Sequence, residues 1–422
     1  MKYKAPLLLS FLAILFLVLL TACAGEPGIQ GPVGPAGPAG PQGPAGPPGD
    51  DATVRLDYVG SEKCGACHED AYATFMLSGH PYKLSKVVNG EAPVFPYDAV
   101  TGGIPGTPEG YTWDDISYVI GGFGWKVRFI DKEGYIITGD EDATTQWNYA
   151  NEFADLDAGW VPYHAGEKKP YNCGSCHTTG YSPEGHQDDL EGIIGTWEFP
   201  GIQCEECHGP GSLHSEDPYG HLMVLDRSNQ LCGECHYRGE KALIDASNGF
   251  TKHHEQYEEL FNSKHFALQC ITCHDPHSSA VYSDQELNPN AGIRQTCETC
   301  HFEQEEYAKV AKHFYMECTD CHMPKNGKSA QGNLDIFRGD ISSHLFAINP
   351  DPAAAQYTED GAYSMPYLTV DYACKQCHNG EIATEKTQEQ LGDAAWGYHD
   401  RPIPTPDPTV EPTAESEAPE TP

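Results

Sequence analysis

The sequence predicts a loop-rich protein whose architecture is set by one repeated cysteine–histidine motif rather than by long regular elements. Only 39% of the 422 residues are hydrophobic, and 44 glycines with 33 prolines divide the chain into short segments. Sixteen of the 17 cysteines fall into eight copies of Cys-x-x-Cys-His, and the seventeenth is Cys23. The fold class therefore depends on what these eight motifs bind.

The first 22 residues have the composition of an export signal. Two lysines precede an apolar run over residues 5–20, which is shorter than the roughly 20 residues that a membrane-spanning helix needs. The run ends in Leu-Thr-Ala-Cys at Cys23, which resembles a bacterial lipobox. That resemblance implies cleavage before Cys23 and lipidation of its sulfur. We therefore expect an exported protein with a lipid anchor, on a membrane facing the periplasm or the cell exterior. The alternative is an ordinary secretory signal followed by an incidental cysteine.

Two low-complexity segments flank the body of the chain. Within residues 23–52, glycine occupies every third position from Gly25 to Gly49, and proline fills many of the sites between, as in collagen. This segment either holds the body away from the membrane or winds three chains into a homotrimer, and its small number of triplets favours the spacer. The body covers residues 53–400. The Pro-rich, acidic residues 401–422 are expected to be disordered.

The chain is strongly acidic, with a formal net charge of −37 from 62 acidic and 25 basic residues. Nucleic acid and anionic lipid surfaces are therefore poor partners, and a protein with a basic docking patch or a cationic mineral surface is a better one. The alternative is that the charge serves solubility alone.

The eight motifs predict covalently bound haem. Cys-x-x-Cys-His is the attachment signature of haem c, in which two thiols form thioethers with the haem and the adjacent histidine binds iron. Zinc knuckles, a redox dithiol or disulfides would not require a histidine after every cysteine pair. We therefore expect eight haem c groups. The attaching cysteines are Cys64, Cys67, Cys173, Cys176, Cys204, Cys207, Cys232, Cys235, Cys270, Cys273, Cys297, Cys300, Cys318, Cys321, Cys374 and Cys377. The iron-binding motif histidines are His68, His177, His208, His236, His274, His301, His322 and His378.

Histidines outside the motifs can supply the sixth iron ligand. His313 follows the motif histidine His301 by 12 residues, and a helix of that length advances about 18 Å, too far for both to bind one iron. His277 and His214 follow their motif histidines by three and six residues, too few to pass around a porphyrin edge. These histidines are therefore predicted to bind neighbouring haems, which would bring the haems into contact.

A repeated Lys-His-Phe element supports this interpretation. His265 and His313 each stand five residues before a motif cysteine, and residues 253–266 echo residues 301–314 without a preceding cysteine pair. That copy predicts a helix with histidines at both ends and leaves open whether His253 or His254 binds iron. The predicted distal ligands are His80, His164, His214, His254, His265, His277, His313 and His344. The residues predicted to be at the surface instead are His186, His221 and His399.

The longest stretch without a motif lies between Cys67 and Cys173. It contains residues 116–138, in which β-branched and aromatic side chains are punctuated by glycine. This pattern predicts a small β-hairpin or meander near residues 110–140.

At these motifs the chain resembles the multihaem cytochromes of the cytochrome c-554 and hydroxylamine oxidoreductase group. Residues 58–80 ("YVGSEKCGACHEDAYATFMLSGH") resemble that group's opening haem segment, and residues 204–214 ("CEECHGPGSLH") resemble its C-H-G-P-G-S-x-H element. Residues 318–324 and 343–346 resemble the closing part of pentahaem nitrite reductases. The resemblance implies a mainly α-helical body with long loops, packed around the haems. The distal ligands that it implies are His80, His214, His265, His277, His313 and His344.

Three functions follow from this interpretation. The spare histidines can make every iron six-coordinate, which favours electron transfer to a redox partner, with no catalytic residue assigned. The alternative is an oxidoreductase that acts on a small nitrogen or sulfur compound, such as nitrite, hydroxylamine or tetrathionate, at one open haem. A weaker alternative is a subunit of an extracellular haem filament.

Overall fold

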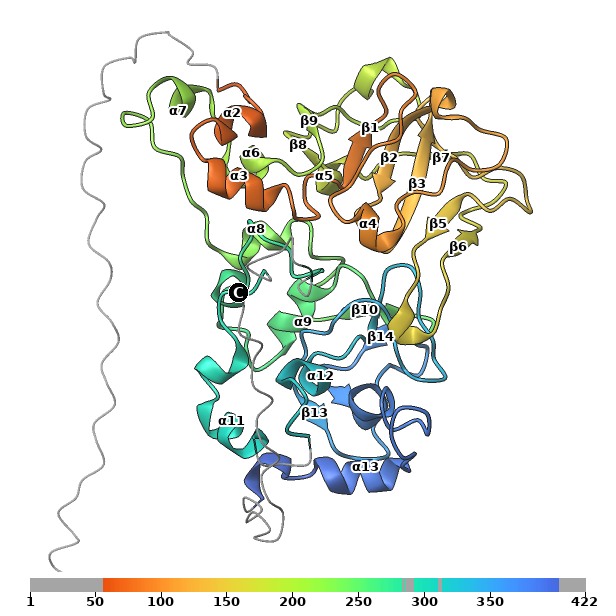
Figure 1. The fold of residues 1–422 in the computed structure, drawn as a ribbon, viewed down its shortest axis with the longest axis vertical. Coiled ribbons are helices and arrows are strands. Elements are labelled where there is room, and N and C mark those ends of the chain that lie inside the picture. The colour runs from red at the N-terminus through yellow and green to blue at the C-terminus, as the bar shows by residue number, and fades with distance from the viewer. Residues whose placement is uncertain (1–55, 283–284, 286–291, 310–312, 402–422) are drawn as a thin grey trace, which may run out of the picture. The chain divides into compact units, whose positions relative to one another are not determined.

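The computed structural model describes residues 56–282, 285, 292–309 and 313–401 (Figure 1). The predicted export signal, the lipidation site at Cys23, the collagen-like segment and the acidic tail after Arg401 lie outside these residues. Within the described ranges, none of the helices has the length and apolar composition that crossing a membrane requires.

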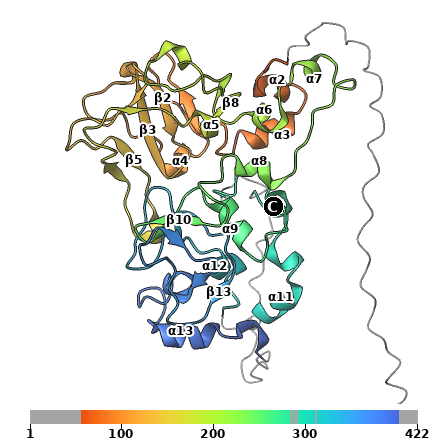
Figure 2. The same ribbon diagram turned by 180° about the vertical axis from the view of Figure 1, so that it is seen from behind.

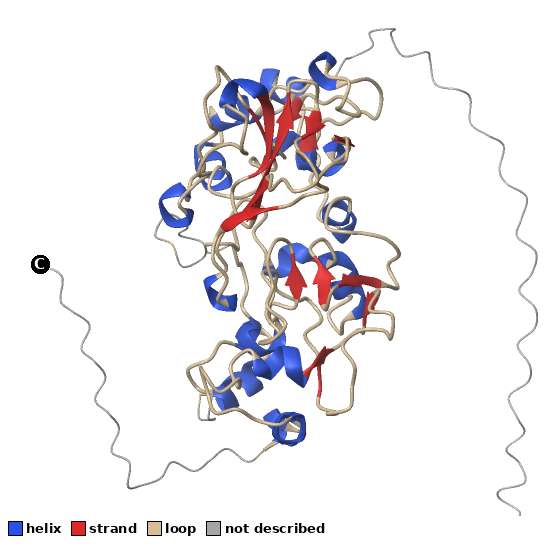
Figure 3. Ribbon diagram, turned by 90° about the vertical axis from the view of Figure 1, so that its right-hand side faces the viewer, coloured by secondary structure: helices blue, strands red, loops and turns tan. Residues whose placement is uncertain are grey.

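The region between the first two motifs forms all seven strands of one sheet (Figures 1 and 3). Strands β2, β3 and β4 are consecutive and antiparallel, so the meander expected near residues 110–140 is present, as part of a larger sheet than predicted. Strand β5 also pairs with β3, and β6 continues from β5. The strands are β1 (Leu84–Lys86), β2 (Ile116–Gly121), β3 (Lys126–Asp131), β4 (Tyr135–Ile136), β5 (Gln146–Asn148), β6 (Gly159–Val161) and β7 (Lys169–Pro170).

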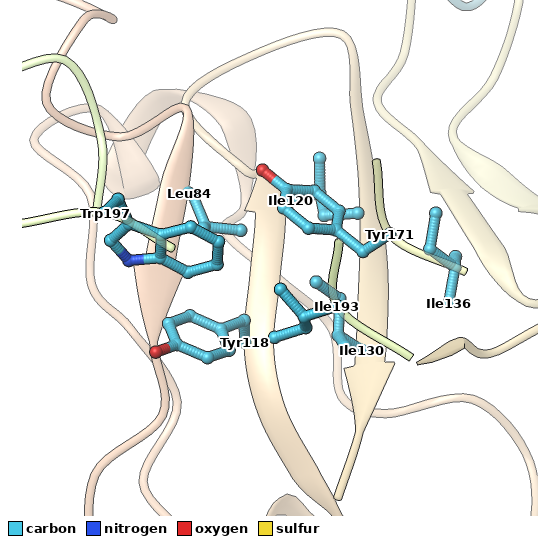
Figure 4. Packing of buried hydrophobic residues seen from close by; sticks show 8 residues of the cluster. All are labelled: Leu84, Tyr118, Ile120, Ile130, Ile136, Tyr171, Ile193 and Trp197. Atoms are coloured by element: carbon cyan, nitrogen blue, oxygen red, sulfur yellow. The ribbon is translucent and has the colours of Figure 1, made fainter. Parts of the chain in front are cut away.

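Both faces of this sheet are buried. Tyr118 and Ile120 point to one face and Val119 to the other, as the two-residue repeat of a strand requires. A register shift between Ile116 and Tyr118 places Ile116 on the same face as Val119. Figure 4 shows the first of these two cores, in which residues of β1–β4 meet aromatic and aliphatic side chains from later in the chain. Its members are Leu84, Tyr118, Ile120, Ile130, Ile136, Tyr171, Ile193 and Trp197.

Smaller sheets support the rest of the body. Four strands pair in the order β12, β11, β10, β14, and two further pairs are β8 with β9 and β13 with β15. The parallel pairing of β11 with β12 joins segments far apart in sequence. The strands are β8 (Thr178–Thr179), β9 (Phe199–Pro200), β10 (Ile244–Ser247), β11 (Phe250–Lys252), β12 (Gly327–Lys328), β13 (Ile348–Asn349), β14 (Tyr363–Ser364) and β15 (Leu368–Thr369).

The helices are short, and only 26% of the structure is helical, so the mainly α-helical fold predicted from the resemblance is not confirmed. The longest described helix, α13, has eight residues. Half of these helices are single turns at the Cys-x-x-Cys-His motifs. The helices are α2 (Ser61–Gly65), α3 (Glu69–Phe75), α4 (Asp98–Thr101), α5 (Gly174–His177), α6 (Cys204–His208), α7 (Ser212–Glu216), α8 (Asn229–Gly233), α9 (Gln256–Asn262), α10 (Cys270–Cys273), α11 (Phe302–Ala308), α12 (Cys318–His322) and α13 (Gln388–Ala395).

Candidate haem-binding sites

Each motif forms about one helical turn, which sets the geometry of haem attachment. In α6, α10 and α12 the two cysteines stand at positions i and i+3, so both sulfurs lie on one side of the turn. None of the sixteen motif cysteines forms a disulfide. The thiols are therefore available for thioether bonds.

Seven of the eight motif histidines face a second histidine. A metal–imidazole bond is about 2.0 Å long and the nitrogen lies about 1.1 Å from the ring centre, so two rings on opposite sides of one iron have centres about 6 Å apart. The seven observed separations between ring centres run from 5.9 to 6.4 Å. This spacing fits an iron between each pair. The pairs are His68–His214, His208–His277, His236–His80, His274–His344, His301–His265, His322–His399 and His378–His313.

In every pair the second histidine comes from the segment of a different motif. His313 lies opposite His378 and not opposite His301, the motif histidine that precedes it. His277 lies opposite His208, and His214 opposite His68. The structure therefore has the crossed arrangement that the sequence offsets predict for these three residues.

The paired rings are oriented for metal binding. The Nδ1 of His322 lies 2.7 Å from the carbonyl oxygen of Phe346, and that of His214 lies 2.8 Å from the carbonyl oxygen of His221. Such a bond leaves Nε2 to bind iron. Burial lowers the pKa of His80 to about 3 and that of His274 to about 4. Both rings are therefore neutral at pH 7, which is the form that binds a metal.

Apolar side chains next to these histidines also fit a bound macrocycle. Phe266 and Phe314, which follow His265 and His313, are 63% and 68% exposed to solvent in the protein alone. Each of these exposed rings is next to a histidine that lies opposite another histidine at the pairing distance. A haem held between the paired histidines would cover them.

Two histidines stand elsewhere than predicted. His164 contacts Glu167 at 3.0 Å and does not lie opposite a motif histidine. His254, another predicted distal ligand, lies within electrostatic range of the motif histidines His177 and His236, and its ring centre is 3.8 Å from that of His253. His399, predicted to be at the surface, lies opposite His322. No repeated element surrounds His399 in the sequence, and α13 with the turn after it brings the ring to this position.

His177 is the exception among the motif histidines. All twenty histidines lie in the described ranges, and no second histidine ring lies at the pairing distance from His177. Burial lowers the pKa of His177 to about 3, and the nearby Lys83 charge adds to this shift. The ring is thus neutral and able to bind iron, and the histidine outside the motifs within its electrostatic range, His254, makes no ring contact with it.

Comparisons with known proteins agree with this geometry. The family described as cytochrome c554 and c-prime matches residues 141–209, and the family of the doubled CXXCH motif matches residues 265–306. The dissimilatory sulfite reductase MccA of Wolinella succinogenes is 25% identical over 300 residues, which cover 52% of this chain and 41% of that protein. The multiheme cytochrome MtrA of Shewanella baltica is 25% identical over 157 residues, which cover 35% of this chain and 42% of that protein.

The solved structure of the Wolinella succinogenes octaheme sulfite reductase MccA shares the fold. It superimposes with a TM-score of 0.54 at 19% identity, over 82% of this chain and 72% of that one. The chain is a multihaem c-type cytochrome of the cytochrome c-554 and hydroxylamine oxidoreductase group. It binds haem c covalently. The cytochrome spans about two fifths of each curated relative that it matches.

The sheet of the cytochrome positions the Cys173 motif. Tyr171 is fully buried in the first core of the sheet, and Cys173 packs against the same core two residues later. Arg128 of β3 lies within electrostatic range of Cys173, and Arg238 within range of Cys176. Two elements far apart in sequence thus bring guanidinium groups to one motif.

Lys126 and Arg128 are neighbours on one face of β3, and both are partly buried. Burial and the Arg128 charge lower the pKa of Lys126 to about 7, and burial also lowers the pKa of Arg128. Within the described ranges, neither side chain has a carboxylate oxygen within 4.0 Å of its nitrogens. The acid in electrostatic range of Lys126 is Asp340, which accepts three backbone N–H groups, from Ser329, Ala330 and Gln331.

Neutral groups hold these cations in place. The Nε of Arg128 donates to Oε1 of Gln146 at 2.6 Å, and the guanidinium lies 3.6 Å from the centre of the Tyr163 ring. The Nζ of Lys126 donates to the carbonyl oxygen of Ser329. The positive charges beside the Cys173 motif are therefore fixed in position but not neutralised.

The motifs of the cytochrome contact one another in a single series. The thiols of Cys64 and Cys204 hydrogen-bond, and this end of the series includes α2, α3, α6 and α7 (Figure 2). Oδ1 of Asn229, in the helix of the Cys232 motif, accepts the backbone N–H of Cys270 at 2.7 Å. The Cys318 thiol lies 3.3 Å from Oε1 of Glu298 in the Cys297 motif. The remaining links, within electrostatic range, join Cys207 to Cys232, Cys273 to Cys300 and Cys321 to Cys374.

The Cys173 motif branches from this series. The Cys176 sulfur lies 3.8 Å from the carbonyl oxygen of Glu234, and the Cys235 sulfur lies 3.9 Å from that of Ser175. The unpaired His177 thus belongs to a side branch that joins the series at the Cys232 motif.

Proposed function

We propose that this cytochrome reduces a small oxyanion at the haem that Cys173, Cys176 and His177 hold. The proposal rests on two features of the structure that lie at the same place, an unpaired motif histidine and two cations without a carboxylate partner among the described residues. The motif histidine without a second ring at the pairing distance, His177, lies within electrostatic range of the partly buried cations Lys126 and Arg128. Neither cation forms an ion pair with a carboxylate among the described residues.

The charge of these cations requires compensation. A buried cation costs several kcal/mol in lost hydration unless an opposite charge or a set of hydrogen bonds offsets it. Gln146, Tyr163 and the Ser329 carbonyl supply dipoles and a ring face but no negative charge. An anion that binds next to the Cys173 motif would provide the missing charge and would be positioned by Lys126 and Arg128.

The remaining motifs fit the delivery of electrons to this position. Haem c groups exchange single electrons, and we propose that eight are attached, seven with two histidine ligands. Seven motifs form the series, and the eighth, the Cys173 motif, joins it through the Cys176–Glu234 and Cys235–Ser175 contacts. An electron entering at either end of the series can therefore reach the branch.

Oxyanion reduction also consumes protons. The ring centres of His253 and His254 lie 3.8 Å apart with their planes at 47°. Burial lowers the pKa of each, that of His254 to about 2, so both rings are neutral. His253 is within electrostatic range of Lys126, Arg128 and Arg238. Because neutral imidazoles with lowered pKa hold no acidic proton, the Lys126 ammonium is the group beside this position that could protonate a bound anion.

The substrate class follows from charge and from one relative. The relative that covers most of this fold is named a sulfite reductase, and sulfite is a small oxyanion that a site with Lys126 and Arg128 would accept. Nitrite has the same charge requirement. Hydroxylamine, which is neutral near pH 7, would gain nothing from these cations.

Electron transfer without catalysis is the second candidate, and the seven histidine pairs favour it. A chain in which every iron is six-coordinate would serve as a relay. The two candidates differ at His177 alone, because the relay requires a second ligand there and the reductase requires an open position.

We also propose the cellular setting. The lipobox-like sequence at Cys23 would anchor the cytochrome to an exported membrane face, and residues 25–49 would space the body from it. The net charge of −37 suits a redox partner with a basic docking patch.

The decisive experiment is spectroscopic. The oxidised protein is expected to give seven low-spin haem signals and one high-spin signal in magnetic circular dichroism, and the reduced protein to bind one carbon monoxide. Viologen-driven reduction of sulfite or nitrite is expected at that haem. A spectrum with eight low-spin haems and no binding of carbon monoxide would establish the relay instead.

A further inference from the structure

We propose that Gln146 is a positioning residue that determines the charge specificity of the site: it orients Arg128 as a neutral partner and so leaves the guanidinium charge for an anionic substrate. The inference rests on the proposed function. It concerns a side chain that would not itself contact the substrate.

The sheet places Gln146 directly beside Arg128. Strand β5 runs antiparallel to β3, with Asn148 opposite Lys126 and Trp147 opposite Val127, which brings Gln146 opposite Arg128. Gln146 is 7% exposed and Asn148 is 5% exposed. The two buried cations of β3 therefore face two buried carboxamides of β5.

A hydrogen-bond relay fixes which way the Gln146 amide points. The Arg128 Nε can only donate, so Gln146 presents Oε1 to it at 2.6 Å. The Gln146 Nε2 then donates to Oδ1 of Asn148 at 2.7 Å. With its Nε used in this way and one face on the Tyr163 ring, the guanidinium keeps its terminal nitrogens for another acceptor.

A carboxylate would fit the same position but would change the chemistry. Glutamate has nearly the shape of glutamine and could accept the same bond from Arg128, in the bidentate form that arginine prefers. The resulting buried ion pair would be neutral overall. Arg128 would then be held as firmly as before, yet it would no longer attract an anion.

The test compares two substitutions at Gln146 in the haem-loaded protein. Gln146→Glu keeps the acceptor and adds a charge, whereas Gln146→Met removes the acceptor and adds none. The affinity of the oxidised protein for sulfite and for nitrite is measured by calorimetry. Carbon monoxide is an uncharged probe, and its binding to the reduced protein shows whether the open haem position is intact.

A matched control is Gln356→Glu. Gln356 is 6% exposed and hydrogen-bonds to Ser364 and Tyr367 beside β14, outside the sheet that carries the cations. The Gln356→Glu substitution adds a buried negative charge at a different place and is expected to leave the affinity for sulfite and nitrite unchanged.

The expected result is a loss of anion affinity of about 30-fold or more in Gln146→Glu, a smaller loss in Gln146→Met, and unchanged binding of carbon monoxide in both. In steady-state reduction, Gln146→Glu is expected to raise KM more than it lowers kcat. Equal affinities in Gln146→Glu and the wild type would overturn this inference alone, and so would equal losses in the two variants. A wild-type protein that binds neither sulfite nor nitrite would overturn the proposed function as well.

Discussion

The imidazole of His80 lies opposite that of His236, with ring centres 6.4 Å apart and ring planes at 89°. His80 follows the first motif and His236 belongs to the fourth. One iron between them would therefore tie the start of the body to its middle. The same crossing recurs in the other six pairs, so the haems would act as cross-links in a chain with few long elements.

Removing one distal histidine is expected to open a second haem. In His80→Ala the iron at His236 loses its sixth ligand, because no other histidine lies at the pairing distance from His236 among the described residues. The reduced variant is expected to bind one more carbon monoxide per chain than the wild type and to show one more high-spin haem. His164→Ala is the control, because His164 is exposed and the side chains that it contacts among the described residues are those of Glu167 and Tyr163. An unchanged number of bound carbon monoxide molecules in His80→Ala would contradict the pairing.

The sequence predicts the haem sites better than it predicts the fold. The motif places two thiols and one imidazole within five residues, so the geometry of haem attachment depends on the neighbouring residues alone. The offsets of His214 and His277 were informative because a chain of a few residues cannot pass around a porphyrin, and that of His313 because a 12-residue helix is too long for both histidines to bind one iron. These offsets exclude the preceding motif histidine as the second ligand of the same iron. Which other motif histidine is the partner depends on tertiary packing.

The errors have physical causes. His399 has no repeated neighbourhood, and its approach to His322 depends on α13 and the turn at Gly397. The sequence predicted fewer strands than the seven in this sheet. Strands β4, β5, β6 and β7 have only two or three residues each, which is too few to show an alternating pattern of hydrophobic and polar residues. The mainly α-helical body was expected from the resemblance alone, whereas the helices that the structure describes have at most eight residues.

The assignment of His399 can be tested by its removal. His399→Ala is expected to convert the haem at His322 from low-spin to high-spin, which absorption and magnetic circular dichroism would report. His186→Ala serves as the control, because the His186 Nδ1 bonds to the carbonyl oxygen of Ile193 and its ring faces no motif histidine. A low-spin spectrum in His399→Ala would mean that another group binds that iron.

Glu205 connects the first and third motifs through hydrogen bonds and is expected to stabilise the folded protein. Its carboxylate is 1% exposed and accepts the backbone N–H groups of Val59, Gly60 and Gly211 at 2.7–3.0 Å. Glu205→Ala would leave three buried donors unpaired. We expect a loss of roughly 3 kcal/mol or more in the free energy of unfolding, measured in denaturant.

Glu206, next to it, provides the comparison. It accepts one backbone N–H, from Gly180 at 2.9 Å, and Glu206→Ala is expected to cost about 1 kcal/mol. Equal effects of the two substitutions would show that the three-donor clamp at Glu205 contributes no more than a single bond.

The ionisation of Lys126 predicts how anion binding depends on pH. Burial, with Arg128 beside it, lowers the pKa of Lys126 to about 7, while Asp340 opposes the shift and Arg238 and Lys328 add to it. The ammonium is therefore present below about pH 7 and is lost above it. Nitrite affinity is expected to be highest on the acidic side and to fall by up to about tenfold per pH unit above pH 7. Nitrite is the suitable probe because it stays a monoanion over this range.

Two substitutions separate the Lys126 charge from other titrating groups. Lys126→Arg keeps the charge at all working pH values, so the fall in affinity is expected to disappear. Lys126→Met removes the charge, so affinity is expected to be low throughout and to vary little with pH. If nitrite affinity in Lys126→Met still falls as the pH rises through 7, the titrating group is not Lys126, and this cation would have no part in binding the substrate.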